Sequence, residues 1–145
     1  MAEAVEVAIQ YALMDKLVAF GTTNSLTISW PNTTFAPPVS TPSAKWLRAN
    51  ILPADTVSLG VNYTSANQHY GLFQVDVFCG QGSGELSPAR TASLLVAHYV
   101  RGTRLSKDGF TVEVTDVPKL GPLLIDGPWV MLPVRIPYTC FASNP

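Results

Sequence analysis

The protein has 145 residues and a mass of 15.6 kDa, of which 47% are hydrophobic and only 13% are charged. Its 9 Lys and Arg residues nearly balance 10 Asp and Glu residues, so no concentrated basic surface is available for a nucleic-acid backbone. Two cysteines, Cys79 and Cys140, are too few for a disulfide scaffold or a thiolate zinc site. Composition therefore excludes these classes, and the length predicts a single domain over residues 1–145.

The N-terminal residues, Met1 to Glu6, are acidic where a secretory signal is basic, and they lack its continuous apolar stretch. No apolar run elsewhere approaches the ~20 residues that a membrane-spanning helix needs. These features predict a protein that is made and folded in a cytoplasm and does not insert into a membrane.

A helix with two apolar sides is predicted from Ala2 to Phe20, with Gly21 as its C-terminal stop. One stripe has the spacing of a side that faces a core: Val5, Ala8, Ile9, Ala12, Leu13, Leu17 and Phe20. At about 100° per residue, a second stripe points nearly the opposite way. It consists of Val7, Tyr11, Met14 and Val18. Either a second helix of the same domain or a neighbouring subunit must cover this side.

Alternation of apolar and polar residues predicts strands at residues 26–30, 45–52 and 69–79. Between the first two, residues 31–44 contain four prolines and predict an irregular loop that carries Phe35. The segment 55–68 is interpreted as a connecting loop or a weak edge strand.

A second helix is predicted from Ser87-Pro88 to Arg101-Gly102, because a cap and a first-turn proline open it and a cation and a glycine close it. Strands follow at residues 110–115 and 130–138. Pro133 and Pro137 lack an amide hydrogen, which predicts that the last strand is an edge, is bent, or is paired on one side only. The order of elements predicts an α+β fold in which two helices pack on one face of a mostly antiparallel β-sheet.

The glycine-rich turn at residues 80–84 has the backbone freedom of a phosphate-binding loop but not its chemistry. It lacks the Gly-Lys-Ser/Thr ending, and Glu85 places a negative charge where a phosphate would bind. Ser83 lies directly between glycines, whereas a nucleophile elbow has its glycines two residues to either side. The turn is interpreted as a hinge.

No arrangement of residues in the sequence is typical of a catalytic or metal site. His69 and His98 are the only histidines, and no acidic residue stands at helical ligand spacing from His98. Asp76 and Glu113 are expected on neighbouring strands, where a solvated sheet face explains them better than a carboxylate pair does. We therefore expect no cofactor and no metal. An enzyme that uses Asp76 and His69 is the remote alternative, and the cysteines are interpreted as inert core thiols.

Large apolar side chains exceed what one small fold needs. Besides the second helical stripe, Trp30 and Phe35 flank the proline loop, and Trp129 and Phe141 lie on the outer side of the last strand. Aromatic residues of this kind concentrate binding energy in protein interfaces. Assembly with other subunits is therefore the function to test.

Several short motifs occur in an order that resembles the tail terminator-like, or tail completion, proteins of tailed bacteriophages and prophages. After a helical N-terminus these are Trp30-Pro31-Asn32, Phe35-Ala36-Pro37-Pro38, Trp46-Leu47-Arg48, Leu52-Pro53, Tyr70 to Val77, Arg101-Gly102-Thr103, Asp126 to Trp129, and Pro133 to Tyr138. The resemblance covers nearly the whole chain, and none of the motifs is a catalytic signature.

The resemblance implies a structural virion protein of the tail and neck, assembled in the host cytoplasm. Its subunits would form a ring, a homohexamer, that docks on the last ring of tail tube protein and stops tube polymerisation. The opposite face of the ring would receive a head-to-tail connector or stopper protein. DNA would be only cargo passing through the lumen, which suits a nearly neutral subunit.

The family provides no set of functional residues to transfer, so the interface residues are assigned from the stripes. Subunit packing is assigned to Val7, Tyr11, Met14 and Val18. Contact with a neighbouring ring or the neck is assigned to loop 31–44 with Trp30, Phe35, Arg101, Arg104 and Trp129. Compensation of charge at a helix end is an alternative role for the two arginines. A head-to-tail stopper or a minor tail protein is the alternative function.

Overall fold

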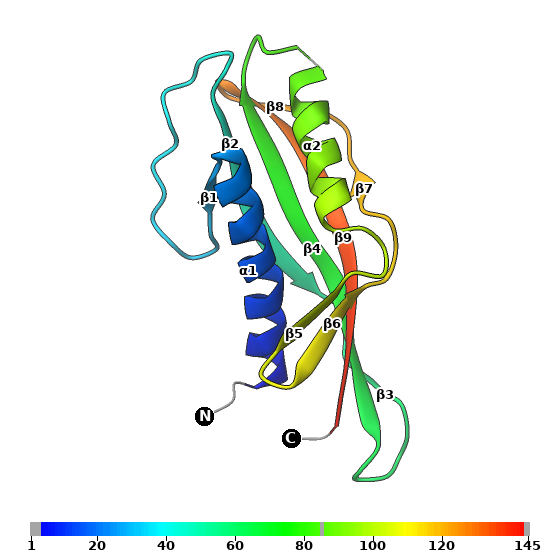
Figure 1. Ribbon diagram of the computed structural model, residues 1–145. Helices are drawn as coiled ribbons and strands as arrows, with labels where there is room; N and C mark the ends of the chain where they lie inside the picture. Colours follow the sequence, from blue (N-terminus) through cyan, green and yellow to red (C-terminus); the bar gives the residue numbers. More distant parts are fainter. Residues whose placement is uncertain (1–3, 85, 144–145) are drawn as a thin grey trace.

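A computed structural model describes residues 4–84 and 86–143 (Figure 1). In these residues two helices are combined with a nine-stranded sheet. The elements in chain order are α1 Val5–Asn24, β1 Thr27–Ser29, β2 Lys45–Pro53, β3 Val57–Ser58, β4 Ala66–Gly80, α2 Leu86–His98, β5 Arg104–Lys107, β6 Phe110–Val114, β7 Lys119–Leu120, β8 Leu124–Asp126 and β9 Trp129–Ser143.

The predicted arrangement of two helices on one face of a mostly antiparallel sheet is wrong. The sheet is mixed, with the strand order β1-β2-β4-β9-β6-β5, and β1 runs parallel to β2. It curls into a half-barrel around α1, which contacts β1 at one end of the strand order and β5 and β6 at the other. The second helix, α2, contacts the central strands β4 and β9 instead. The helices therefore do not share one flat face (Figure 1).

Strands β1 and β2 can run parallel because the proline loop that joins them is long. Antiparallel neighbours can be joined by a tight turn, but parallel neighbours need a crossover of about a dozen residues or more. Residues 30–44 provide that crossover, so the chain returns to the starting end of β1 before β2 begins (Figure 1).

The long antiparallel pair of β4 and β9 forms the centre of the sheet, in register from Ala66 opposite Ser143 to Gly80 opposite Trp129. On its other side β9 meets only three short strands, β6, β7 and β8. The carbonyls of Pro133 and Pro137 accept hydrogen bonds on that interrupted side, from the amides of Gly121 and Thr115. The two prolines therefore leave the β4 ladder intact, and β9 is a central strand rather than an edge.

The main core consists of buried residues from α1, α2 and the strands of the curved sheet. The stripe of α1 that was predicted to face a core is buried except for half-buried Val5, and α1 continues to Asn24 rather than stopping at Gly21. Gly21 is buried inside the helix, where a Cβ atom would lie 2.9 Å from the carbonyl oxygen of Leu26. Ser25, at φ 55°, provides the left-handed turn that ends the helix.

Tyr99, just after α2, ties the two helices together. Its side chain is fully buried, and its hydroxyl donates a 2.8 Å hydrogen bond to the carbonyl oxygen of Leu13 in α1. Burial raises the pKa of this phenol far above its ordinary value. The hydroxyl therefore stays protonated and remains a hydrogen-bond donor.

A second, smaller core lies on the convex face of the sheet, beneath the proline loop. Trp46 stacks on Phe78 with ring centroids 4.0 Å apart, and the ring of Trp129 meets Trp46 edge-on. Phe35 in the loop covers the stack at 5.0 Å from the Trp46 ring. Between residues 31 and 43, Phe35 is the one residue that is not exposed, so it anchors the loop on the sheet.

The environment of His98 predicts that acid destabilises the protein. Its Nε2 lies 2.7 Å from the carbonyl oxygen of Lys16, where a neutral imidazole donates a hydrogen bond. Burial lowers the pKa of His98, against a smaller opposing effect of this hydrogen bond. As the pH falls below about 6.5, the unfolded chain therefore takes up the proton first, and folding stability is lost.

We expect the free energy of unfolding in urea to fall between about pH 7.5 and pH 5.5, and His98→Gln to reduce that slope. Equal slopes for wild type and His98→Gln would contradict a neutral His98 in the fold.

Candidate assembly surfaces

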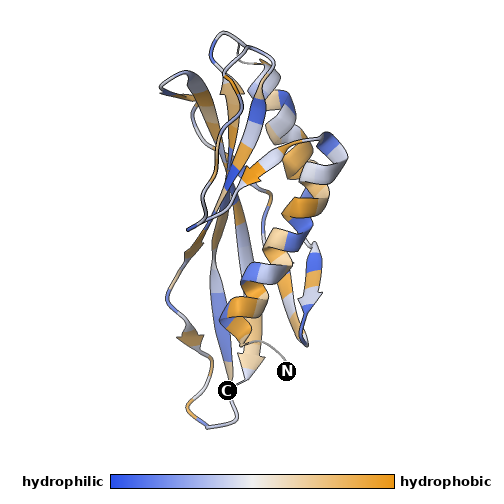
Figure 2. Cartoon of the chain, turned by 90° about the vertical axis from the view of Figure 1, so that its left-hand side faces the viewer, coloured by the Kyte–Doolittle hydropathy of each residue, from blue (hydrophilic) through white to orange (hydrophobic). Residues whose placement is uncertain are grey.

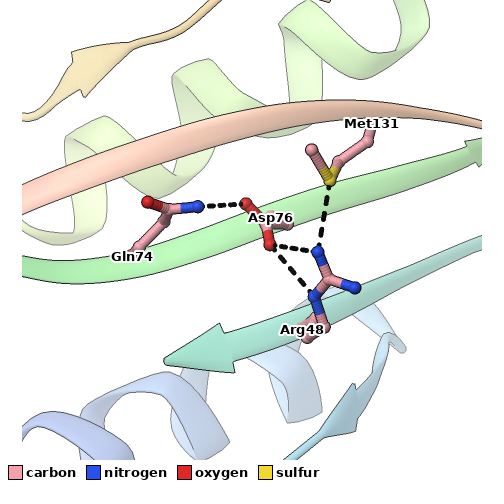
Figure 3. A network of polar contacts seen from close by, with 4 residues as sticks. All are labelled: Arg48, Gln74, Asp76 and Met131. Carbon is pink, nitrogen blue, oxygen red and sulfur yellow. Dashed lines mark hydrogen bonds and ion pairs between the residues drawn. The ribbon is translucent and has the colours of Figure 1, made fainter. Parts of the chain in front are cut away.

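The most prominent polar group inside the sheet is a carboxylate whose two oxygens are both occupied (Figure 3). Asp76 is fully buried, and its Oδ2 accepts bonds from Nε and Nη2 of Arg48 at 3.1 and 2.9 Å. Its Oδ1 accepts a 2.9 Å bond from Gln74, and the Arg48 Nη2 also lies 3.4 Å from the sulfur of Met131. Both carboxylate oxygens accept hydrogen bonds from side chains of the sheet, so the network links the neighbouring strands β2, β4 and β9. It leaves neither oxygen directed at a substrate.

The residues of the enzyme alternative are not brought together. Asp76 and His69 are seven positions apart on β4, roughly 23 Å along an extended strand, and they point to opposite faces of the sheet. Strand β9 lies between the strands that carry Asp76 and Glu113, so these carboxylates are not on neighbouring strands. Asp76 therefore cannot act together with His69 or with Glu113 as a catalytic pair.

The other candidate chemical groups lie in structural surroundings. Cys79 and Cys140 are buried free thiols, and burial raises the pKa of each. In the described part of the chain, His, Cys, Asp and Glu side chains form no group of three or more that could hold a metal ion. Over the same residues, neither helix has the combination of length and apolar character required to cross a bilayer.

The second stripe of α1 is left uncovered by the subunit itself. Val7, Tyr11 and Val18 are exposed, with 46% of Tyr11 and 48% of Val18 accessible, and Met14 is half-buried. Lys107 on β5 places its Nζ 5.1 Å from the centre of the Tyr11 ring. Apolar residues therefore occur around α1 on solvent-facing positions as well as core-facing ones (Figure 2).

The residues assigned to contacts with a neighbouring ring occupy three separate places. Phe35 and Trp129 belong to the aromatic cluster on the convex face, where Trp129 is 7% exposed. Trp30 packs against the main core. Arg101 is exposed beyond α2, and Arg104 on β5 pairs with Glu113 at 3.4 Å. The structure thus does not combine them into one surface.

A further apolar surface, which was not predicted from the sequence, follows the outer side of β9. Exposed large apolar residues recur in the short strands β7 and β8 and the segments beside them: Val117, Leu120, Leu123, Leu124 and Ile125. The available signal was the run Leu120-Gly121-Pro122-Leu123-Leu124-Ile125, which is apolar but interrupted by turn residues.

Comparison with solved structures shows the same fold in another protein. One solved chain superposes with a TM-score of 0.78 and 26% sequence identity, and the match covers 99% of each chain. A comparison with curated proteins gives no significant match.

The family is shown by the sequence itself. Residues 8–138 match the family described as phage tail terminator protein, and this chain belongs to that family. The resemblance inferred from the short motifs is thereby confirmed. Membership identifies a structural component of a bacteriophage tail with a role in tail completion.

Proposed function

We propose that the chain is one tail terminator-like domain that forms a closed homohexameric ring at the head-proximal end of the phage tail tube. The ring would bind the last ring of tail tube protein and stop its polymerisation. Its other face would receive the connector or stopper protein of the head. Family membership over residues 8–138 supports the tail role.

The observation that carries the ring is the uncovered stripe of α1. Its four members, Val7, Tyr11, Met14 and Val18, lie outside the main core cluster of the subunit, although α1 buries its other side almost completely. In a closed ring of head-to-tail contacts, every subunit presents two complementary patches. We assign the α1 stripe to one of them.

The contacts along the ring axis are assigned to loop 31–44 and to the arginines after α2. The loop is fastened to the subunit at Phe35 and again at Ser40 and Thr41, which lie against Pro128 and Gly80. Its other residues up to Ser43 are exposed and available to a neighbouring ring. The net charge of −1 suits a lumen through which DNA passes without being held.

Tyr11→Asp is expected to leave the fold intact and to abolish ring formation. Tyr11 is half-exposed and lies near Lys107, so an aspartate is tolerated in the isolated subunit but places a charge inside the proposed interface. Light scattering at several concentrations measures the mass, and Gln10→Asp, exposed on another side of the same helix, is the matched control.

The outcomes separate the alternatives. A wild-type protein that stays monomeric and fails to bind tube ends contradicts the proposed function. A Tyr11→Asp protein that does not fold would place the second stripe in the internal core instead. Normal-length tails in particles that lack the protein would favour a head-to-tail stopper or a minor tail protein.

A further inference from the structure

A pocket opens between the first half of α1 and the sheet, at the end of the sheet where β2 finishes. Its volume is about 360 Å³, at the small end of the range of ligand pockets. Its apolar walls come from both sides, with Ile9 and Met14 from α1 and Ile51 and Pro53 from β2. One chain provides the whole lining, so the pocket exists in a single subunit.

The sheet has room for the pocket because Gly71 carries no side chain. Gly71 of β4 lies opposite Pro53 of β2 and Tyr138 of β9. A Cβ atom on Gly71 would lie 2.9 Å from the Cα atom of Pro53 and 3.0 Å from the hydroxyl oxygen of Tyr138. The hydroxyl of Tyr138 therefore lies beside Pro53, and both of these residues line the pocket.

Tyr138 brings an unused hydrogen-bonding group to this pocket. The residue is only 3% exposed, yet its hydroxyl makes no hydrogen bond to any residue that the structure describes. The hydroxyl is not among the side-chain atoms that are sealed from solvent, so a group in the pocket can reach it. Polar groups of buried residues nearly always have hydrogen-bond partners. A ligand in the pocket would supply the partner that Tyr138 lacks.

The charge at the pocket is negative. Glu6 of α1 lines the pocket and forms no ion pair within the described ranges. Asp55 is exposed between the lining residues Ala54 and Thr56. Neither Lys nor Arg lines the pocket. An anionic ligand would be repelled here, whereas a cation would gain a carboxylate partner.

An arginine side chain matches the groups that the pocket offers. Its aliphatic stem packs on apolar walls while its charged end stays near water. The planar guanidinium carries several N–H donors, so it can bind the Glu6 carboxylate and also donate to the hydroxyl oxygen of Tyr138. A lysine ammonium is a compact point charge without this fork of donors. The small volume suits one long side chain rather than a cofactor.

We infer that this pocket binds the side chain of an arginine presented by another protein chain of the tail. The assignment to another chain rests on the proposed function, because a structural component of a tail meets other chains during assembly. The preference of the pocket for a guanidinium does not rest on it, because the pocket lies within one chain.

Methyl NMR of the wild-type protein tests the pocket, with N-acetylarginine methylamide as the probe. The methyl resonances of Ile9, Met14 and Ile51 are expected to shift and to saturate, in a ring as in a single chain. The corresponding citrulline probe has nearly the same shape without the charge and should bind about tenfold more weakly. The lysine probe should also bind more weakly than the arginine probe.

Substitutions assign the binding to the two polar groups. Glu6→Gln is expected to weaken binding of the arginine probe about tenfold, and Tyr138→Phe about fivefold. Asp15→Asn is the matched control, because it makes the same change of charge at an exposed position of α1 outside the pocket. Thermal unfolding verifies that the variants fold. Glu6 is exposed, so its variant tests the pocket even if the loss of the Tyr138 hydroxyl affects stability.

Methyl shifts that are absent or do not saturate would overturn the inference. Equal binding of the citrulline or lysine probe would overturn the assignment to arginine, and binding by Glu6→Gln at the strength of the wild type would do the same.

Phage particles that lack the protein distinguish the source of the arginine. The double variant Glu6→Gln, Tyr138→Phe should fail to restore the joining of tails to heads, whereas Asp15→Asn should restore it. Full restoration by the double variant would overturn the assignment to another chain of the tail. Tails of normal length without any of these proteins would contradict the proposed function, and the NMR titration would still decide whether the pocket binds a guanidinium.

Discussion

Gly80→Ala is expected to destabilise the protein by about 3 kcal/mol, the upper end of the usual cost of forcing extra atoms into a packed site. Gly80 is the last residue of β4, and the returning proline loop passes directly over it. A Cβ atom at this position would overlap the carbonyl oxygen of Thr41, which is backbone and cannot rotate away. The loop would have to lift, and the bond from the Gly80 amide to the carbonyl of Ala44 would weaken with it.

Gly82→Ala provides the matched control in the turn that follows β4. A Cβ atom on Gly82 would have no atom within 4 Å, and the φ of 94° makes alanine cost only about 1 kcal/mol. Urea unfolding of both variants measures the difference. If Gly80→Ala proves as stable as Gly82→Ala, the loop does not lie against the end of β4.

Trp46→Ala is expected to cost about 3–5 kcal/mol, because it removes the centre of the aromatic cluster on the convex face. The indole is 7% exposed and contacts the rings of Phe78, Trp129 and Phe35. Its loss also removes the surface on which Phe35 anchors the proline loop. We therefore expect proteolysis within residues 31–44 to become faster as global stability falls.

Trp46→Phe separates ring packing from hydrogen bonding at the same site. The Nε1 of Trp46 is buried and has no hydrogen-bond partner among the described residues, so a phenyl ring loses no polar contact. We expect a smaller cost than for Trp46→Ala by urea unfolding, because the phenyl ring keeps part of the stacking surface. Equal losses for Trp46→Phe and Trp46→Ala would contradict the claim that stacking of the rings stabilises the cluster.

The long elements were predictable because each has a single dominant pattern. The core-facing stripe of α1 has helical spacing, and alternation marks β2, β4 and β9. Their ends shifted by a few residues, most clearly at Gly21, which was predicted to stop a helix that continues to Asn24. The need for close packing against Leu26 explains this glycine better than termination does.

The curvature and the short strands were not predictable from periodicity. Strands of two to four residues, such as β5, β7 and β8, are too short to show alternation. One turn signal was present: Asp108-Gly109, with positive φ at both residues, joins β5 to β6 in a two-residue hairpin. The half-barrel depends on contacts between α1 and both ends of the sheet, which no local pattern encodes.

The assignment of the α1 stripe to an assembly surface stays a prediction. The α1 stripe stood out because exposed apolar residues break the expected polar side of a helix. The exposed apolar residues between positions 117 and 125 did not stand out, because exposure of a short segment depends on which strand it borders. Trp129 and Phe35, which were assigned to contacts with a neighbouring ring, pack around Trp46 within the same chain.

The length of tails assembled in phage particles that lack this protein tests the proposed terminator role most directly. Electron micrographs of such lysates are expected to show tail tubes that are longer than normal, variable in length and not joined to heads. Supplying the wild-type chain should restore a uniform length and joining to heads, whereas the Tyr11→Asp variant, which is expected not to form rings, should not. Tubes of normal, uniform length in the absence of the protein would contradict the account.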